Sequence, residues 1–166
     1  MFTTKSLSTM VLLTLAMLNP ANPTFAQIET KHAKMQIAMP GEFKKETLKI
    51  DENLDQFQLV FNQDNGTVIV AHQDSTPVAD AQAILQVAQD AIVKVAGGEV
   101  LEMTNFKLNG YPARKFRVSM PSIDGEFRVS HIYTGDKFYQ VMAVGTSEFS
   151  ASDAINKMFE SATITK

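Results

Sequence analysis

Three turn-forming dipeptides, each between runs of strand-forming residues, constrain the fold of this chain most. They are Asn65-Gly66, Asn109-Gly110 and Asp124-Gly125. Asn-Gly and Asp-Gly favour tight hairpin turns, because both residues adopt positive φ at little cost. Strands joined by such short turns pair in the antiparallel direction. We therefore expect antiparallel sheet to form the framework of this protein.

The residues around the first dipeptide predict a hairpin. Apolar side chains alternate over residues 57–61, and residues 67–73 (TVIVAHQ) form the returning arm. An earlier strand is predicted over residues 34–39, where every second side chain is apolar, and Pro40-Gly41 ends it.

A long helix is expected after the hairpin. Ser75-Thr76-Pro77 resembles a helix start and Gly97-Gly98 a helix stop. One side of this helix is apolar, with Val78, Ala81, Leu85, Ala88, Ile92 and Val95. The other side is polar and predicted to be solvated, with Asp80, Gln82, Gln86, Gln89, Asp90 and Lys94.

Four more strands are predicted in the second half of the chain. They cover residues 99–108, 111–120, 126–134 and 137–144, joined by turns at Asn109-Gly110, Asp124-Gly125 and Gly135-Asp136. A closing amphipathic helix follows, capped by Ser150 or Ser152, and residues 163–166 can add a short strand. The predicted fold class is α+β: a hairpin and a four-strand antiparallel meander, flanked by one long helix and one C-terminal helix.

The N-terminus predicts export. Lys5 precedes an apolar run over Met10–Leu18, and Thr24 and Ala26 supply small residues before Gln27. We expect residues 1–26 to be a signal peptide, 27–33 a flexible leader and 34–166 one domain without a membrane span. The expected location is the periplasm or the extracellular medium, or the thylakoid lumen in a photosynthetic organism.

Composition excludes several function classes. The chain contains no Cys, so it has no thiol nucleophile, disulfide, Cys-ligated zinc or iron–sulfur cluster. Its formal net charge is −3, which does not indicate nucleic-acid binding. No Gly-x-Ser-x-Gly motif marks a nucleophilic serine, and no catalytic residues are predicted.

A divalent metal is the one cofactor that the sequence suggests. His72 and Asp74 lie two apart on a predicted strand and therefore face the same side; His131 is available from the meander. Imidazole and carboxylate together can bind zinc or iron. The alternative is a polar end to a strand that leaves the core.

A basic strip is the second candidate site. Lys115, Arg117 and Arg128 lie on neighbouring strands of the predicted meander. If Asp124-Gly125 closed a two-residue turn, Arg117 would face Ile132 and Lys115 would face Thr134. The strip suits an acidic partner or anionic ligand; the alternative is a solvated face whose charges discourage edge pairing.

The meander resembles the hairpin of PsbP-like domains. The matching residues are Leu108-Asn109-Gly110-Tyr111-Pro112-Ala113 followed by Lys115-Phe116-Arg117, with Met-Pro-Gly-Glu-Phe at 39–43 before the first hairpin. The resemblance covers about residues 34–166. It implies a sheet flanked by helices in a family that mostly lacks enzymatic activity and includes extrinsic photosystem II subunits and assembly factors. The chain lacks the lipidated Cys of cyanobacterial PsbP proteins.

Three functions follow as hypotheses. The first is a non-enzymatic interaction module on an envelope or membrane complex, with a photosystem II subunit as a special case. The second is a carrier of a small ligand, held between sheet and helix. The third is a metal-dependent hydrolase using His72, Asp74 and His131.

Overall fold

The structure is a computed structural model that describes residues 24–29 and 33–165. The described part is mostly β: strands account for 55% and helices for 24%. The predicted α+β class is therefore wrong. The helices are short and few, and two strands that the sequence analysis did not predict enlarge the β content.

Seven strands form the main sheet, which is antiparallel throughout in the order β3-β4-β5-β9-β8-β7-β6. Their bounds are β3 (Lys44–Lys49), β4 (Asp55–Gln63), β5 (Gly66–Asp74), β6 (Val100–Leu108), β7 (Tyr111–Met120), β8 (Gly125–Tyr133) and β9 (Lys137–Thr146). The predicted hairpin and the predicted meander are both present. They are parts of one sheet, because β5 pairs with β9 along its whole length.

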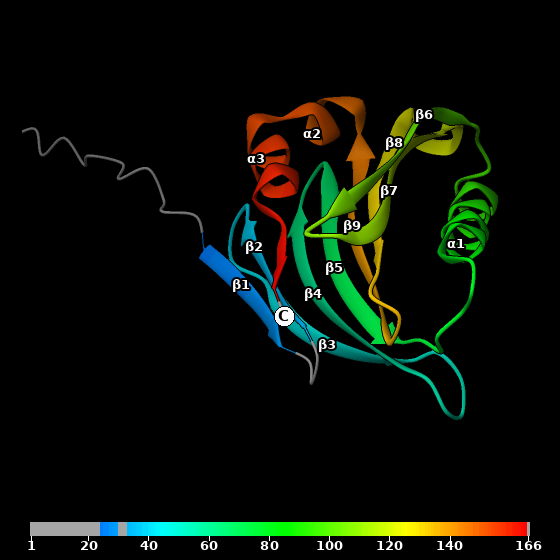
Figure 1. Cartoon of the computed structure of the whole chain (residues 1–166). Helices are drawn as coiled ribbons and strands as arrows, with labels where there is room; N and C mark the ends of the chain where they lie inside the picture. The colour runs from blue at the N-terminus through cyan, green and yellow to red at the C-terminus, as the bar shows by residue number, and fades with distance from the viewer. Residues whose placement is uncertain (1–23, 30–32, 166) are drawn as a thin grey trace, which may run out of the picture.

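A smaller sheet and the helices cover the two faces of the main sheet (Figure 1). The smaller sheet has the order β1-β2-β10, with β1 (Thr24–Glu29), β2 (Lys34–Met39) and β10 (Thr163–Thr165). It lies on one face together with α2 (Ser147–Ala151) and α3 (Asp153–Ser161); α1 (Ala81–Ala96) lies on the other. A single 3-10 turn, η1 (Pro121–Ile123), connects β7 to β8.

The largest hydrophobic core lies between the two sheets. Met35, Ile37 and Met39 of β2 are almost fully buried there. They share this core with Val70, Tyr139 and other side chains of the main sheet, and with Ile155 and Met158 of α3. The alternation predicted for residues 34–39 is thus present, but this strand belongs to the smaller sheet.

The predicted turns differ in outcome. Asn109-Gly110 is the expected tight turn, with φ values of 51° and 91°, and Gly135 likewise has a positive φ, of 97°. The first hairpin instead turns at Asp64-Asn65, since Gln63 pairs with Gly66. Gly66 has no room for a side chain, because a Cβ atom there would lie 2.2 Å from the Phe149 ring.

The two predicted helices also differ from expectation at their ends. Asp80, and not Ser75 or Thr76, caps α1, and its carboxylate accepts from the backbone N–H groups of Gln82 and Ala83. Gly97 ends α1 as predicted, in the left-handed region at φ 63°. Ser152 caps α3, also as predicted, but it separates α3 from the short α2.

Strands β1 and β3 were missed for different reasons: β3 has no buried face, and the residues of β1 were assigned to a signal peptide and a leader. All six residues of β3 are exposed at the sheet edge, so the strand needs no apolar alternation. β1 contains the predicted cleavage point after Ala26, and Ala26 and Ile28 are buried against β2. The flexible leader is therefore wrong over residues 27–29; residues 1–23 of the predicted signal peptide lie outside the described residues.

The polar side of α1 is not simply solvated, because it holds a buried guanidinium. Arg114 of β7 is 4% exposed. It donates to the amide oxygens of Gln86 (2.6 Å), Gln89 (3.2 Å) and Gln82 (3.3 Å) on α1, and to Asn105 (2.8 Å) on β6. Gln89 itself is buried. These bonds fix α1 on the sheet without a carboxylate partner for Arg114 among the described residues.

The packing of the junction between α1 and β6 predicts different stability losses for substitutions at its two glycines. A Cβ atom on Gly98 would lie 1.9 Å from the carbonyl oxygen of Ser119, whereas one on Gly97 would meet nothing within 4 Å. Gly98→Ala should lower the free energy of unfolding by about 2–3 kcal/mol, because backbone must move. The matched Gly97→Ala should cost only about 1 kcal/mol, from its left-handed φ. Urea unfolding measures both values; an equal or smaller loss for Gly98→Ala would contradict the packing of this junction.

Candidate functional site

A cleft of about 630 Å³ lies between the outer strands of the main sheet and the two C-terminal helices. β6, β7 and β8 form its floor, and α2 and α3 form its wall. Six charged side chains line it: Glu102, Lys115, Arg117, Glu126, Arg128 and Glu160. All three residues of the predicted basic strip are therefore in one cleft.

The strands place the basic side chains together, but in a register different from the predicted one. Arg117 faces Arg128, and Lys115 faces Ser130, because η1 makes the β7–β8 connection longer than a two-residue turn. The expected pairings of Arg117 with Ile132 and Lys115 with Thr134 are wrong. The partner of Arg117 shifts from Ile132 to Arg128, which is an even number of residues. The basic side chains therefore still project from one face of the sheet.

Arg117 is already neutralised within the cleft. Its Nη2 and Nε donate to the two carboxylate oxygens of Glu126, at 2.5 Å and 3.2 Å. Glu126 is buried, so this bidentate pair is shielded from water on the carboxylate side. The hydrogen bond with Glu126 raises the pKa of Arg117 above its usual value.

Arg128 is held differently, by neutral acceptors that bond to only one of its guanidinium nitrogens. Its Nη1 donates to the carbonyl oxygen of Ser150 at 3.1 Å and to Oδ1 of Asn156 at 2.5 Å. The guanidinium carbon lies 4.6 Å from the centre of the Phe159 ring, within the range of a cation–π contact. Burial, and then the nearby Arg117 charge, lower the pKa of Arg128 from its usual value.

Lys115 and Ser150 are two further polar residues in the lining of the cleft. Lys115 is exposed, and no ion pair or hydrogen bond joins its ammonium to another described residue. Ser150 is 1% exposed, and its hydroxyl is buried without a hydrogen-bond partner in the described part of the chain. Three cations and three carboxylates line the cleft, so it is formally neutral and not the basic strip that the sequence predicted.

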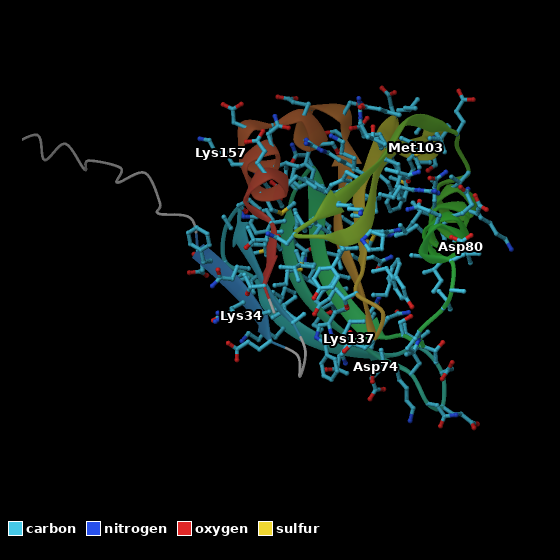
Figure 2. All side chains as sticks on the ribbon, in the orientation of Figure 1. Lys34, Asp74, Asp80, Met103, Lys137 and Lys157 are labelled. Atoms are coloured by element: carbon cyan, nitrogen blue, oxygen red, sulfur yellow. The ribbon has the colours of Figure 1, made fainter. Side chains whose placement is uncertain are left out.

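The predicted metal ligands are not brought together. His72 lies in one cross-strand row with Tyr139 and Ile132, so His131, the neighbour of Ile132, projects from the opposite face of the sheet. Asp74 is paired with Lys137 at one end of the sheet (Figure 2). Within the described residues, no group of three or more His, Asp or Glu side chains could hold a metal ion.

The two sheet histidines have separate environments. His72 stacks on Phe57, with ring centres 5.2 Å apart, beside a smaller groove of about 270 Å³ between β1 and β3–β4. His131 is fully buried between Phe116 and Phe138, and its Nε2 lies 3.1 Å from the amide nitrogen of Gln140. Because that amide donates, His131 Nε2 accepts, and the neutral ring carries its proton on Nδ1.

Four residues that shape the cleft were not predicted as site residues: Glu126, Ser150, Asn156 and Phe159. Glu126 could have been predicted from the sequence, because alternation along the strand places it on the same face as Arg128, Ser130 and Ile132. A carboxylate at an inward position of a central strand needs a buried partner. Asn156 and Phe159 reach the site only through the packing of α3 on the sheet, which the sequence does not specify.

No protein-family model matches this chain, and no curated protein matches it. Membership of the PsbP-like family therefore stays a prediction. Among the described residues, no helix is both long enough and apolar enough to cross a bilayer.

The buried histidine predicts how stability depends on pH. Burial, and then the charge of Arg114, lower the pKa of His131 to about 3, against 6.5 for a free histidine. Between these pH values the unfolded chain binds a proton that the folded chain does not. The free energy of unfolding should therefore fall as the pH drops from 6.5, by up to about 1.4 kcal/mol per pH unit.

Urea unfolding at a series of pH values tests this for the wild type and His131→Gln. The variant should show a shallower slope, with the residual slope shared by other groups, including His72, whose pKa is also lowered, chiefly by burial. An unchanged slope in His131→Gln would show that His131 does not resist protonation in the folded state.

Proposed function

We propose that this protein is an exported, non-enzymatic interaction module that docks on a larger envelope or membrane complex through the charged cleft. The observation that carries the proposal is the convergence of Lys115 and Arg128 on the cleft with cationic groups that form no ion pair with a described carboxylate. An acidic segment of a partner supplies the complementary charge.

The architecture of the cleft supports binding more than surface solubility. A charged face that serves only solubility needs no supporting contacts, whereas Arg128 is positioned by Ser150, Asn156 and Phe159 from two helices. Arginine with an aromatic neighbour in a partly enclosed position is typical of the residues that dominate binding energy at interfaces. The resemblance to PsbP-like domains points the same way, and an extrinsic photosystem II subunit is its special case.

A small-ligand carrier is the second candidate, favoured by the volume of the same cleft. About 630 Å³ lies within the range of small-molecule sites. The two functions differ in what stays bound to the protein from its native source: a protein complex or a small molecule.

Capture from the native envelope tests the interaction module. Tagged protein is crosslinked mildly in place, purified and analysed by mass spectrometry. Lys115→Glu combined with Arg128→Gln should lower recovery of the captured complex by at least about tenfold, because interface cations of this kind carry a large share of binding.

Lys49→Glu is the matched control, because it reverses an exposed charge on β3, at the opposite edge of the sheet. It should leave recovery unchanged. Equal recovery with the cleft variant, at unchanged thermal stability, would refute docking through this cleft. Recovery of a small molecule in place of a complex would favour the carrier.

A further inference from the structure

We propose that Arg128 binds a single carboxylate group of the ligand through its Nε and Nη2 atoms, with the Lys115 ammonium as a second, weaker contact. The inference rests on the proposed function and assigns the chemical class that the cleft recognises. It depends on three features of the site: the pre-positioned guanidinium of Arg128, the neighbouring Arg117 that is already paired with Glu126, and the three carboxylates of the lining, which disfavour an anion of higher charge.

The guanidinium of Arg128 is positioned before any ligand arrives. Both hydrogen bonds of the guanidinium use Nη1, and its central carbon lies over the Phe159 ring. Nε and Nη2 have no hydrogen-bond partner among the described residues, and neither is a buried unpartnered atom. These two atoms form the edge of arginine that binds a carboxylate in a bidentate manner.

Arg117 shows the same chemistry already satisfied. Its own Nε and Nη2 bind the two oxygens of Glu126. Arg117 and Arg128 are cross-strand neighbours on β7 and β8. The floor of the cleft therefore has two arginines side by side, one with its Nε–Nη2 edge bonded to a carboxylate and one with that edge unbonded. Arg117 shows the bidentate geometry with a carboxylate, and Arg128 is the arginine available to a ligand.

The charge balance favours a monoanion over a phosphate. Glu102 and Glu160 lie on the rim and Glu126 on the floor, so a doubly charged phosphate would meet three carboxylates. A carboxylate brings one charge and matches the arginine edge. Its arrival also offsets the repulsion between Arg117 and Arg128, which, together with burial, lowers the pKa of Arg128.

Lys115 lies where it can support this contact, and Ser150 holds Arg128 in place for it. Lys115 pairs with Ser130 in the strand register, so it is a diagonal neighbour of Arg128 on the same face. Ser150 supports Arg128 through its carbonyl oxygen, which accepts from Nη1. Its hydroxyl is buried and is not offered to a ligand in the cleft.

A carboxylate can come from an acidic side chain or from a chain end, and three tripeptides separate these sources. The first is acetyl-Gly-Glu-Gly-amide, which has one side-chain carboxylate. The second is acetyl-Gly-Gln-Gly with a free C-terminal carboxylate, and the third is the neutral acetyl-Gly-Gln-Gly-amide. Each is titrated into the millimolar range and followed by ¹⁵N NMR, with inorganic phosphate as a fourth probe.

We expect one or both carboxylate peptides to bind saturably, and neither the neutral peptide nor phosphate. Arg128→Lys keeps the charge but removes the bidentate edge, so it should weaken binding by about 10- to 100-fold. Lys115→Gln should weaken it by about 2- to 5-fold. Lys157→Gln, an exposed lysine of α3 labelled in Figure 2, should have no effect.

Two results would overturn the carboxylate assignment: no saturable binding by either carboxylate peptide, or tighter binding of phosphate. Unchanged affinity in Arg128→Lys would overturn the bidentate contact. Envelope capture with Arg128→Lys separates this failure from that of the proposed function. Wild-type recovery with Arg128→Lys, but loss with Lys115→Glu and Arg128→Gln, would leave docking through the cleft intact and remove only the bidentate contact.

Discussion

The antiparallel pairing of β5 with β9 is the interaction on which the rest of the structure depends. Without it, the first hairpin and the four-strand meander are separate small sheets. With it, one register runs across seven strands, and the parity of each residue assigns its side chain to one of two faces. This continuous register places His72 and His131 on opposite faces, and the β7–β8 pairing within the same sheet gathers Lys115, Arg117 and Arg128 on one face.

The three arginines of the chain show how local surroundings decide what a cation does. Arg114 lies under α1, enclosed by amide oxygens, and serves to hold that helix on the sheet. Arg117 is neutralised by the buried Glu126. Arg128 is supported from one side and open on the other. Only Arg128 combines a fixed position with an unbonded Nε–Nη2 edge, and this combination is what a preorganised binding residue requires.

Local patterns in the sequence predicted most strands and the candidate basic residues, whereas tertiary contacts decided the rest. Asn109-Gly110 turns as its φ preferences require, whereas the first hairpin turns one residue earlier than expected, at Asp64-Asn65, and Gly66 begins β5 in close contact with Phe149. β3 has no inward-facing apolar side, so periodicity could not reveal it, and the fold class was wrong in consequence. The glutamines of α1 read as solvent-facing because their partner, Arg114, belongs to a strand more than twenty residues away.

The most direct test of the account is the side-chain NMR signal of Arg128. The Nε–Hε resonances of the three arginines are assigned by substitution and followed while a carboxylate peptide is added. The account predicts that the Arg128 signal shifts strongly and exchanges more slowly with water, while those of Arg114 and Arg117 change little because their donors are already bonded. A larger response from Arg117, or equal responses from all three, would contradict the assignment of Arg128 as the open anchor of the cleft.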